Sequence, residues 1–383
     1  MTTSIRTNFQ FHPYHLVSPS PWPLYTSISL GTLGLTSALS MHNFYNTYIL
    51  WYISFILVIA SMSLWFRDII AEGKYKFNNT LYYYYNLNIA RTISSTDIEK
   101  AINIYNTANN LTVFKDNNNL SYYLAGLLEG NGSINLPSLG VTILNRVLNP
   151  RIIFTSHINN MGMYLFLQSE LGNIGRFQKS SENVLRYIIG DKESIIKIIN
   201  LVHGKLRTPK NKRFNDLIQF MNKKYFLNIP KSYLDNTSFS ENSWFAGFSE
   251  ADGHFGIKCV ERKSKSTTRK RSRSESVSLK FRLDQRLFDK PTLSSMEPFM
   301  QSLAFFLNVN LKLYEIKNSK ILSLSVESIK NQGNIINYFN KYHLIGDKLN
   351  DFKKWKMVYH MILSKEHLTE EGRLKIRNLI NRL

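Results

Sequence analysis

Two long apolar stretches lie near the start of the chain, at residues 23–41 and 48–65. No Asp, Glu, Lys or Arg occurs between Arg6 and Arg67, and each stretch approaches the roughly 20 residues that cross a bilayer. The pattern predicts two transmembrane helices with a turn at residues 42–43. It does not fit a cleavable signal peptide, which has a charged start and a single apolar span.

Residues 76–119 follow with a different composition, rich in Asn, Tyr and Thr and without a steady hydrophobic period. Such a segment does not supply the repeated apolar face that a packed helix or strand needs. We therefore expect a partly disordered linker over this part of the chain.

From residue 120 onward, one pattern of helices and strands occurs twice. In each copy a helix is followed by two strands, a helix, two more strands and a further helix, in the order αββαββα. The strand predicted at residues 276–286 alternates most clearly between apolar and polar positions. Its apolar residues are Val277, Leu279, Phe281 and Leu283, and its polar residues are Ser278, Lys280, Arg282 and Asp284. The pattern predicts an α+β fold in which each sheet packs one face on helices and leaves a basic face open.

A nine-residue string begins each copy, LAGLLEGNG at residues 124–132 and FAGFSEADG at residues 245–253. Small residues at the second and third positions of both strings would let two helices approach closely along one face. Gly132 and Gly253 at the ninth position are expected to adopt the left-handed turn that commonly ends a helix. The residues assigned to these two motif helices are Leu124, Ala125, Gly126, Glu129, Gly132, Phe245, Ala246, Gly247, Glu250 and Gly253.

The two strings differ at the eighth position, where the first has Asn131 and the second has Asp252. If the helices lie side by side, these two side chains meet at one end of the seam. A carboxylate is unfavourable at a helix C-terminus because the helix dipole is negative there, and a divalent cation reverses that effect. The seam is therefore a candidate site for Mg²⁺ and for phosphodiester hydrolysis, with Asp252 and Asn131 as metal ligands.

The net charge is +21 at pH 7, and it is unevenly distributed along the chain. Residues 1–75 contain three cationic and two acidic side chains, so almost the whole excess lies beyond them. A region this basic favours a polyanion such as nucleic acid as its partner. Cys259 is the only cysteine, which excludes a disulfide within the chain and a metal site made of several cysteines.

Polar and cationic residues on the predicted strands, and the run RKSKSTTRKRSR at residues 262–273, are candidates for contacts with nucleic acid. A solvated, polar sheet face is the alternative interpretation. In the first copy the candidates are Arg146, Arg151, Arg176, Gln178, Lys179 and Arg186. In the second copy they are Lys258, Arg262, Lys263, Arg269, Lys270, Arg271, Lys280, Arg282, Gln285 and Arg286.

With two motifs and matching elements after each, residues 120–383 resemble the single-chain LAGLIDADG homing endonucleases. The resemblance implies two αββαββα halves whose sheets form a saddle over double-stranded DNA. It also implies that the eighth-position acids hold divalent metal ions. Asp252 matches the family acid, whereas Asn131 departs from it.

The same resemblance implies that each half contributes a lysine to the chemistry. The segments NKRFND and DKLND resemble the family's lysine segments, and we assign Lys212 and Lys348 to this role, with Lys210 as the alternative to Lys212. Glu129 and Glu250 match the sixth position of the family motif, where we expect them to support the structure rather than the chemistry.

A second resemblance covers about the first 75 residues. HPYHLVSPSPWPL at residues 12–24 and WFRDIIAEGKY at residues 65–75 resemble the start of cytochrome c oxidase subunit III. This implies a mitochondrial exon read in frame into an intron reading frame, with the first segment in inner-membrane lipid and the remainder in the matrix. The predicted domains are residues 1–75, the linker at 76–119, and the two repeats at 120–235 and 236–383.

The preferred function is a monomeric, pseudo-two-fold, intron-encoded endonuclease that cuts a specific DNA site with Mg²⁺ or another divalent cation. Because Asn131 carries no charge, we expect weakened cleavage, either a nick by the intact half or none. The alternative is an RNA maturase that helps its own group I intron to splice, for which a lost acid is tolerable. A membrane-embedded respiratory subunit is disfavoured, because the later helices of subunit III are missing and the remainder is strongly basic.

Overall fold

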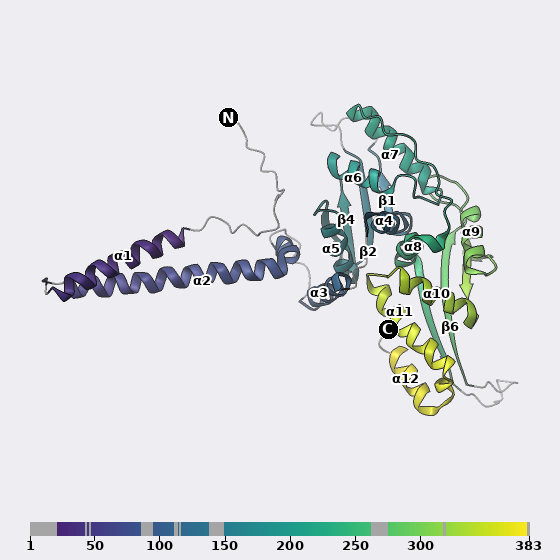
Figure 1. Ribbon diagram of the computed structural model, residues 1–383. Coiled ribbons are helices and arrows are strands. Elements are labelled where there is room, and N and C mark those ends of the chain that lie inside the picture. Colours follow the sequence, from purple (N-terminus) through teal and green to yellow (C-terminus); the bar gives the residue numbers. More distant parts are fainter. Residues whose placement is uncertain are drawn as a thin grey trace. The chain divides into compact units, whose positions relative to one another are not determined.

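The computed structural model describes residues 21–42, 44–45, 47–85, 95–110, 114, 116–137, 149–261, 275–316 and 319–380. By the contacts among its elements, the chain divides into two compact units, Met1–Ala90 and Arg91–Leu383. Figure 1 labels the helices and strands of both units. Each unit is described by itself.

The first unit consists of two helices that pack against each other, α1 (Trp22–Met41) and α2 (Thr47–Tyr85) (Figure 1). The Trp51 indole Nε1 donates a hydrogen bond of 2.9 Å to Ser37 Oγ across the pair. Within the described residues, one helical segment is long and apolar enough to cross a membrane, Thr47–Arg67 of α2, with a mean hydropathy of 2.1.

The second transmembrane helix expected at residues 23–41 is not confirmed. Helix α1 forms there, but many of its positions are Ser or Thr, which lower its hydropathy. Their hydroxyls donate back to carbonyls one turn earlier, as Thr26 and Ser29 do at 2.8 Å. His42 takes part in the predicted turn, and Asn43 lies outside the described residues.

The linker expected at residues 76–119 is wrong in part, because two helices occupy much of it. Helix α2 continues past the expected boundary at residue 75, and α3 (Ser95–Asn110) packs against α5 (Met161–Glu170). The buried face of α3 is short and surrounded by Asn and Thr, so its helical period is weak in the sequence. Its buried side chains are Ala101, Ile104 and Ala108.

The second unit contains both repeats, and each repeat builds an antiparallel sheet of four strands, in the orders β1-β2-β4-β3 and β5-β6-β8-β7. The first repeat consists of α4 (Asn117–Asn131), β1 (Gly132–Asn135), β2 (Arg151–His157), η2 (Ile158–Asn160), α5, β3 (Arg176–Ser181), β4 (Val184–Ile189), α6 (Lys192–Val202) and α7 (Lys210–Tyr225). The second consists of η3 (Phe239–Glu241), α8 (Trp244–Asp252), β5 (Gly253–Val260), β6 (Ser276–Arg286), α9 (Glu297–Leu307), β7 (Lys312–Ile316), β8 (Ser319–Val326), α10 (Ile329–Lys341), α11 (Asp347–Leu363), η4 (Glu366–Leu368) and α12 (Glu370–Ile380). The expected α+β fold is confirmed, and each half contains the αββαββα order. The structure adds helices after that order, α7 in the first half and α11 and α12 in the second.

Strand β6 shows how the alternating sequence forms the sheet. Leu279, Phe281 and Leu283 are almost completely buried, whereas the polar residues between them are partly exposed on the opposite face. Phe281 pairs with Phe255 on β5 and with Val326 on β8, so three apolar side chains form a buried row. Aromatic residues of α10 and α11 pack on this row, which leaves the other face of the sheet open.

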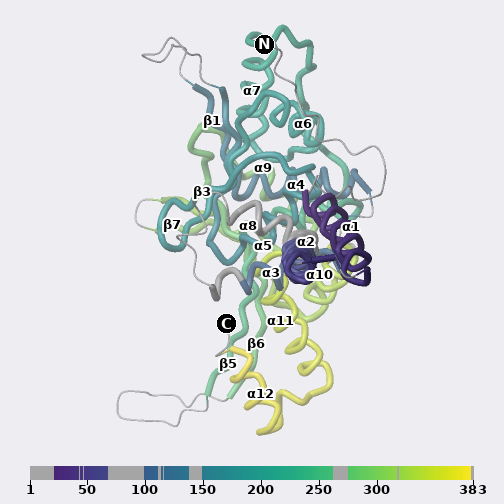
Figure 2. The backbone as a smooth tube through the Cα atoms, turned by 90° about the vertical axis from the view of Figure 1, so that its left-hand side faces the viewer, coloured from purple at the N-terminus to yellow at the C-terminus, as the bar shows by residue number. Residues whose placement is uncertain are grey.

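The motif helices α4 and α8 lie side by side between the two sheets, as Figures 1 and 2 show from perpendicular directions. Their approach is close because two glycines lie in the contact. A Cβ atom on Gly126 would overlap the Trp244 carbonyl, and one on Gly247 would overlap the Tyr123 carbonyl. The close packing predicted from the small residues is therefore confirmed.

The left-handed turns expected at Gly132 and Gly253 are wrong. Both glycines have extended backbones, with φ −85° and ψ 147° at Gly132 and φ −69° and ψ 144° at Gly253. Each chain passes directly from the helix into the first strand of its sheet. Glycine is needed there for room, since a Cβ atom would lie 2.5 Å from the Leu128 carbonyl oxygen or 2.6 Å from the Ser249 carbonyl oxygen.

Candidate active site at the ends of the motif helices

Asn131 and Asp252 are the last residues of the two motif helices, at the same end of the seam. A Cβ atom on Gly130 would lie 3.2 Å from Asp252 Oδ2, so the carboxylate lies against the last turn of α4. The Asn131 side chain lies beside the buried Tyr164 hydroxyl of α5, although no hydrogen bond of normal geometry joins them. The two helix ends therefore present one acid and one amide at a common place.

The Asp252 carboxylate is mostly buried, and Gln285 Nε2 donates a hydrogen bond of 2.8 Å to its Oδ2. Burial raises the pKa of Asp252 above the ordinary value of an aspartate side chain. The Gln285 hydrogen bond and the charges of Lys210 and Lys348 oppose that rise in pKa. Asp252 is thus a partly buried carboxylate near two lysines, where a further cation would favour its ionised form.

Lys210, at the start of α7, is held at the end of the first motif helix. Its ammonium donates to the carbonyl oxygens of Leu128 at 3.0 Å, Glu129 at 2.6 Å and Gly132 at 2.7 Å. Burial lowers the pKa of Lys210, and the acids Glu129, Asp289 and Asp252 act in the opposite direction. A lysine here satisfies carbonyls that a helix C-terminus leaves without partners.

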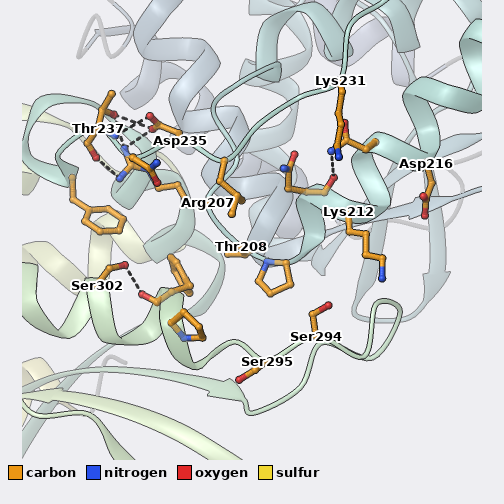
Figure 3. A pocket seen from close by; sticks show the side chains of 18 of the residues that line it. Arg207, Thr208, Lys212, Asp216, Lys231, Asp235, Thr237, Ser294, Ser295 and Ser302 are labelled. Carbon is orange, nitrogen blue, oxygen red and sulfur yellow. Dashed lines mark hydrogen bonds and ion pairs between the residues drawn. The ribbon is translucent and has the colours of Figure 1, made fainter.

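The assignment of Lys212 is not supported by this geometry. Lys212 is exposed, and it lines a cavity of about 720 Å³ between α7, the segment that joins the repeats and the start of α9 (Figure 3). It is not among the groups that act on the Asp252 carboxylate. The alternative weighed from the sequence, Lys210, is the lysine beside the seam.

Lys348 holds the corresponding place in the second half, at the second position of α11. Its charge opposes the rise in pKa of both Asp252 and Glu250, so the ammonium lies near the second motif end. Within the described residues, no hydrogen bond or ion pair joins the Lys348 ammonium to another group. Lys210 and Lys348 therefore have matching positions but different partners.

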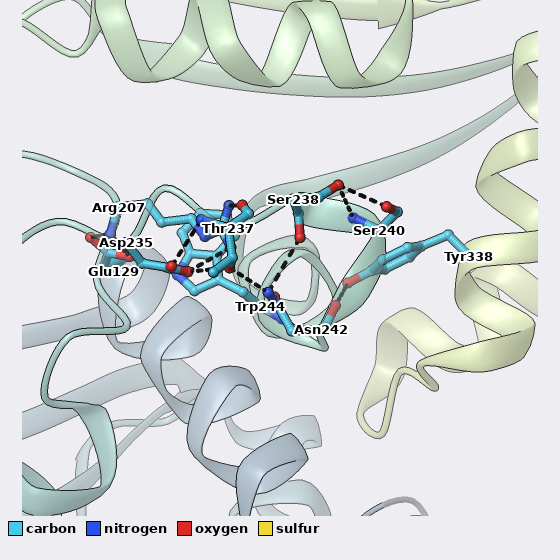
Figure 4. Close-up of polar contacts among 9 residues, drawn as sticks. All are labelled: Glu129, Arg207, Asp235, Thr237, Ser238, Ser240, Asn242, Trp244 and Tyr338. Carbon is cyan, nitrogen blue, oxygen red and sulfur yellow. Dashed lines mark hydrogen bonds and ion pairs between the residues drawn. The ribbon is translucent and has the colours of Figure 1, made fainter.

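The sixth-position glutamate of the first motif holds the loop that leads to Lys210. The Glu129 carboxylate accepts from the backbone N–H of Arg207 at 3.0 Å, the N–H of Thr208 at 2.6 Å and the Thr208 hydroxyl at 2.5 Å. It also accepts a hydrogen bond of 2.8 Å from the Trp244 indole N–H of the other repeat (Figure 4). Burial raises the pKa of Glu129, and these four donors counteract that rise.

The second glutamate repeats the arrangement in the other direction. Glu250 accepts from the backbone N–H of Ile345 at 2.9 Å and from the Tyr123 hydroxyl at 3.3 Å. Burial raises the pKa of Glu250 as well. Ile345 precedes Lys348 by three residues, as Arg207 precedes Lys210, and this shared spacing identifies the two lysines as equivalent. The structural role expected for both glutamates is consistent with these contacts.

A family model described as LAGLIDADG endonuclease matches residues 124–221 and 245–359, which together exceed half of the chain. The chain belongs to the LAGLIDADG endonuclease family. An uncharacterised 37.2 kDa protein of cox1 intron 2 from Schizosaccharomyces pombe is 26% identical over 259 residues, covering 67% of this chain and 70% of that protein. The crystal structure of the I-SmaMI homing endonuclease bound to cleaved DNA has a TM-score of 0.54 at 21% identity. That likeness covers 68% of this chain and 95% of that chain, and it shows the fold.

The start of this LAGLIDADG protein has a different relationship. A cytochrome c oxidase subunit III model matches residues 12–93, which is longer than the expected segment of 75 residues. The subunit 3 of Podospora anserina is 61% identical over 89 residues, covering 23% of this chain and 33% of that protein. The chain therefore spans about a third of the length of the oxidase subunits that it matches, and these matches imply a mitochondrial origin.

The open face of the second LAGLIDADG sheet carries Lys258, Lys280, Arg282 and Arg286, as the sequence predicts. Two of these cations already have acidic neighbours, since Lys280 Nζ lies 2.9 Å from Glu327 Oε1 and Arg282 Nη2 lies 2.9 Å from Asp284 Oδ2. Gln285 departs from the prediction. It pairs in register with the buried Leu322, on the side that packs on helices, and it contacts Asp252 instead.

The open face of the first LAGLIDADG sheet carries the partly or fully exposed side chains Arg151, Arg176, Gln178 and Arg186. Lys179 departs from the prediction, because it pairs with the buried Leu185 on the opposite face. A bulge follows it before Ser181. The remaining candidates lie outside the described residues, and they are Arg146, Arg262, Lys263, Arg269, Lys270 and Arg271.

Several residues that shape the site are absent from the sequence prediction. Tyr123 and Trp244 each stand one residue before a motif, and that shared position was the available signal. Arg207 forms a buried ion pair of 2.6 Å with Asp235, and its guanidinium lies 4.3 Å from the centre of the Phe239 ring. This pair ties the Lys210 loop to the segment that joins the repeats, and no local pattern indicated it.

Proteins of the LAGLIDADG endonuclease family depend in general on divalent metal ions. Within the described residues, no three His, Cys, Asp or Glu side chains come together as a ligand set. Mg²⁺, however, is commonly bound by one or two carboxylates, with water and substrate phosphates as the other ligands. Asp252 fits such a site, whereas the first half offers the neutral Asn131 amide beside the Lys210 ammonium.

Proposed function

We propose that this chain is an intron-encoded, site-specific DNA endonuclease in which the second half carries the chemistry. The observation that carries the proposal is the unequal seam, with the partly buried Asp252 at the end of α8 and Asn131 at the end of α4. The two open sheet faces with their Arg and Lys residues suit the phosphates and base edges of double-stranded DNA. The expected products are nicked molecules rather than double-strand breaks.

The proposed mechanism uses few groups of the chain. Asp252 would hold the divalent ion, and Gln285 orients its carboxylate through the 2.8 Å hydrogen bond. When bound, such an ion supplies Lewis-acid stabilisation and an activated water at the scissile phosphate. Lys348 supplies a positive charge for the phosphate oxygens, because its ammonium is near Asp252 and has no hydrogen bond within the described residues.

A supercoiled plasmid that carries the joined exon sequence tests this proposal. With Mg²⁺ and residues 91–383, we expect open circles to accumulate faster than linear molecules. Asp252→Asn and Lys348→Met should each lower the nicking rate by about 100-fold or more, the range seen when one charge-stabilising group is removed. Efficient linearisation by the unmodified protein, equal to that of an Asn131→Asp variant, would refute the proposal.

Lys212→Met is the matched control for Lys348→Met. Lys212 lies on the surface of α7, away from the groups that act on Asp252, so its loss should leave the rate of nicking unchanged. A reduction as large as that of Lys348→Met would show that the lysine assignment is wrong.

The second candidate function is an RNA maturase that helps the same intron to splice. Asn131 favours it, because RNA binding does not require a second metal-binding acid. The basic open sheet faces suit an RNA backbone as well as DNA. Splicing of the intron transcript, with and without protein, separates the two candidates, since a maturase accelerates splicing when Asp252→Asn has removed DNA nicking.

We also propose a place for the protein within mitochondria. The apolar segment Thr47–Arg67 suits anchorage in the lipid of the inner membrane, and the basic second unit suits the matrix, where mitochondrial nucleic acid lies. Carbonate extraction of isolated mitochondria tests the anchorage. The full chain should stay with the membrane pellet, and a version that begins at residue 91 should be released.

A further inference from the structure

The two seam lysines have different electrostatic surroundings, although they are equivalent in position. The Lys210 ammonium uses its donors on three backbone carbonyls at the end of α4, at 2.6–3.0 Å. The Lys348 ammonium makes no such contact with the residues that the structure describes. Lys210 is thus fixed at the end of its motif helix, and Lys348 is left available.

The fixed ammonium lies where the first half has no acid. The carbonyl end of α4 is the negative end of its dipole, and Asn131 adds no charge to it. Lys210 supplies one positive charge at that end through direct hydrogen bonds. A divalent ion placed at the same end would be repelled by this ammonium and would find an amide in place of a carboxylate.

The second half has the opposite arrangement. Asp252 adds a negative charge to the carbonyl end of α8, and Gln285 Nε2 holds its Oδ2 through a hydrogen bond of 2.8 Å. A divalent ion at this carboxylate would compensate the negative charge. These groups therefore favour a divalent cation at the end of α8, beside Asp252, and disfavour one at the neighbouring end of α4, where Asn131 and the Lys210 ammonium lie.

We propose that Lys210 is a built-in cation that replaces a metal ion in the first half, so that the protein binds a single divalent ion, at Asp252. The proposal deepens the proposed function and rests on it for the role of the ion. It assigns Lys210 as a positioning residue, which stabilises the end of α4 and does not take part in the chemistry.

Counting bound ions tests the proposal directly. The full chain in detergent micelles is titrated with Mn²⁺, and free Mn²⁺ is measured by electron paramagnetic resonance. We expect one bound ion per chain, and none in Asp252→Asn. Asn131→Asp should still bind one ion because Lys210 remains, whereas Asn131→Asp combined with Lys210→Met should bind two.

Two bound ions in the unmodified protein, or two in Asn131→Asp alone, would overturn the proposal. Both proteins keep Lys210, so the hydrogen bonds at the end of α4 are intact in each measurement. Lys212→Met, two positions further along α7, is the matched control and should leave the ion count unchanged. Lys210→Met should lower the melting temperature, and Lys212→Met should not. Because cleavage is not measured, an inactive protein that binds one ion supports this inference while it refutes the proposed nuclease.

Discussion

Each motif glutamate is held partly by the other repeat. Trp244 donates to Glu129, and Tyr123 donates to Glu250, so the residue before each motif reaches across the seam. Each glutamate then fixes the loop that precedes the lysine of its own half. The position of each lysine therefore depends on an aromatic residue of the opposite repeat, which couples the two halves through direct contacts.

Replacing either aromatic donor tests this coupling. Trp244→Phe and Tyr123→Phe keep most of the packing but leave a buried carboxylate short of a donor. Each should lower the free energy of unfolding by about 1–3 kcal/mol, the cost of a lost hydrogen bond to a buried polar group. Urea denaturation measures the change. Two variants that both stay within about 0.5 kcal/mol of the unmodified protein would contradict the coupling.

The raised pKa of Asp252 gives a pH dependence with a definite sign. The folded protein binds this proton more tightly than the unfolded chain, whose pKa is near 3.8. Without metal, the stability from this group is therefore present at low pH and is lost as pH rises through the folded pKa.

Metal binding needs the ionised carboxylate, so its pH dependence has the opposite direction. The increase in melting temperature that Mn²⁺ produces should be small near about pH 4.5 and grow toward about pH 7. Thermal melts with and without Mn²⁺ over this range measure it. Asp252→Asn should show no Mn²⁺-dependent change at any pH, and a change of normal size in that variant would place the ion elsewhere.

At the scale of elements, the contact between α4 and α8 holds Asn131 and Asp252 next to each other, because the two helix backbones pack without space for a further methyl group. Gly126→Ala would place a methyl group into the Trp244 carbonyl, a backbone atom that cannot move without separating the helices. We expect a loss of about 1–3 kcal/mol or more, although Ala is the better helix former by about 1 kcal/mol.

Gly190→Ala is the control for this prediction, because the nearest heavy atom to its Cβ position is Arg151 Cγ at 3.5 Å. That substitution should change the free energy of unfolding by less than about 0.5 kcal/mol. Chemical denaturation of both variants makes the comparison. A Gly126→Ala protein as stable as Gly190→Ala would mean that the helices are not in tight contact.

For the molecule as a whole, the assignment of α3 to the second unit rather than to a linker has the largest consequence. It precedes the first motif and was expected to be linker, yet Ala101, Ile104 and Ala108 are buried in the second unit. A version that begins at residue 91 should melt as a cooperative unit. One that begins at residue 112 loses this packing and should be less stable by about 2 kcal/mol or more. Equal melting temperatures of the two versions would show that α3 does not stabilise the repeats.

Much of the fold was predictable because it depends on the spacing of apolar and small residues over short stretches of the sequence. The alternation in residues 276–286 predicted which face of β6 is buried, and the small residues of the two motifs predicted a close helix contact. The lysine was harder to predict. Lys210 and Lys212 are separated only by Asn211, so the sequence around the two lysines is almost the same. On helix α7 they lie on different faces, and only Lys210 contacts the end of α4.

The sequence by itself determined the two repeats, the exchange of an acid for Asn131, and the concentration of positive charge beyond the first segment, because each depends on residue identity and spacing. The tertiary structure alone decided that Gln285 contacts Asp252, that Lys210 caps α4, and that each glutamate is held across the seam. Those contacts join residues 33 to 115 positions apart, and no local pattern specifies which distant partner a buried polar group will find.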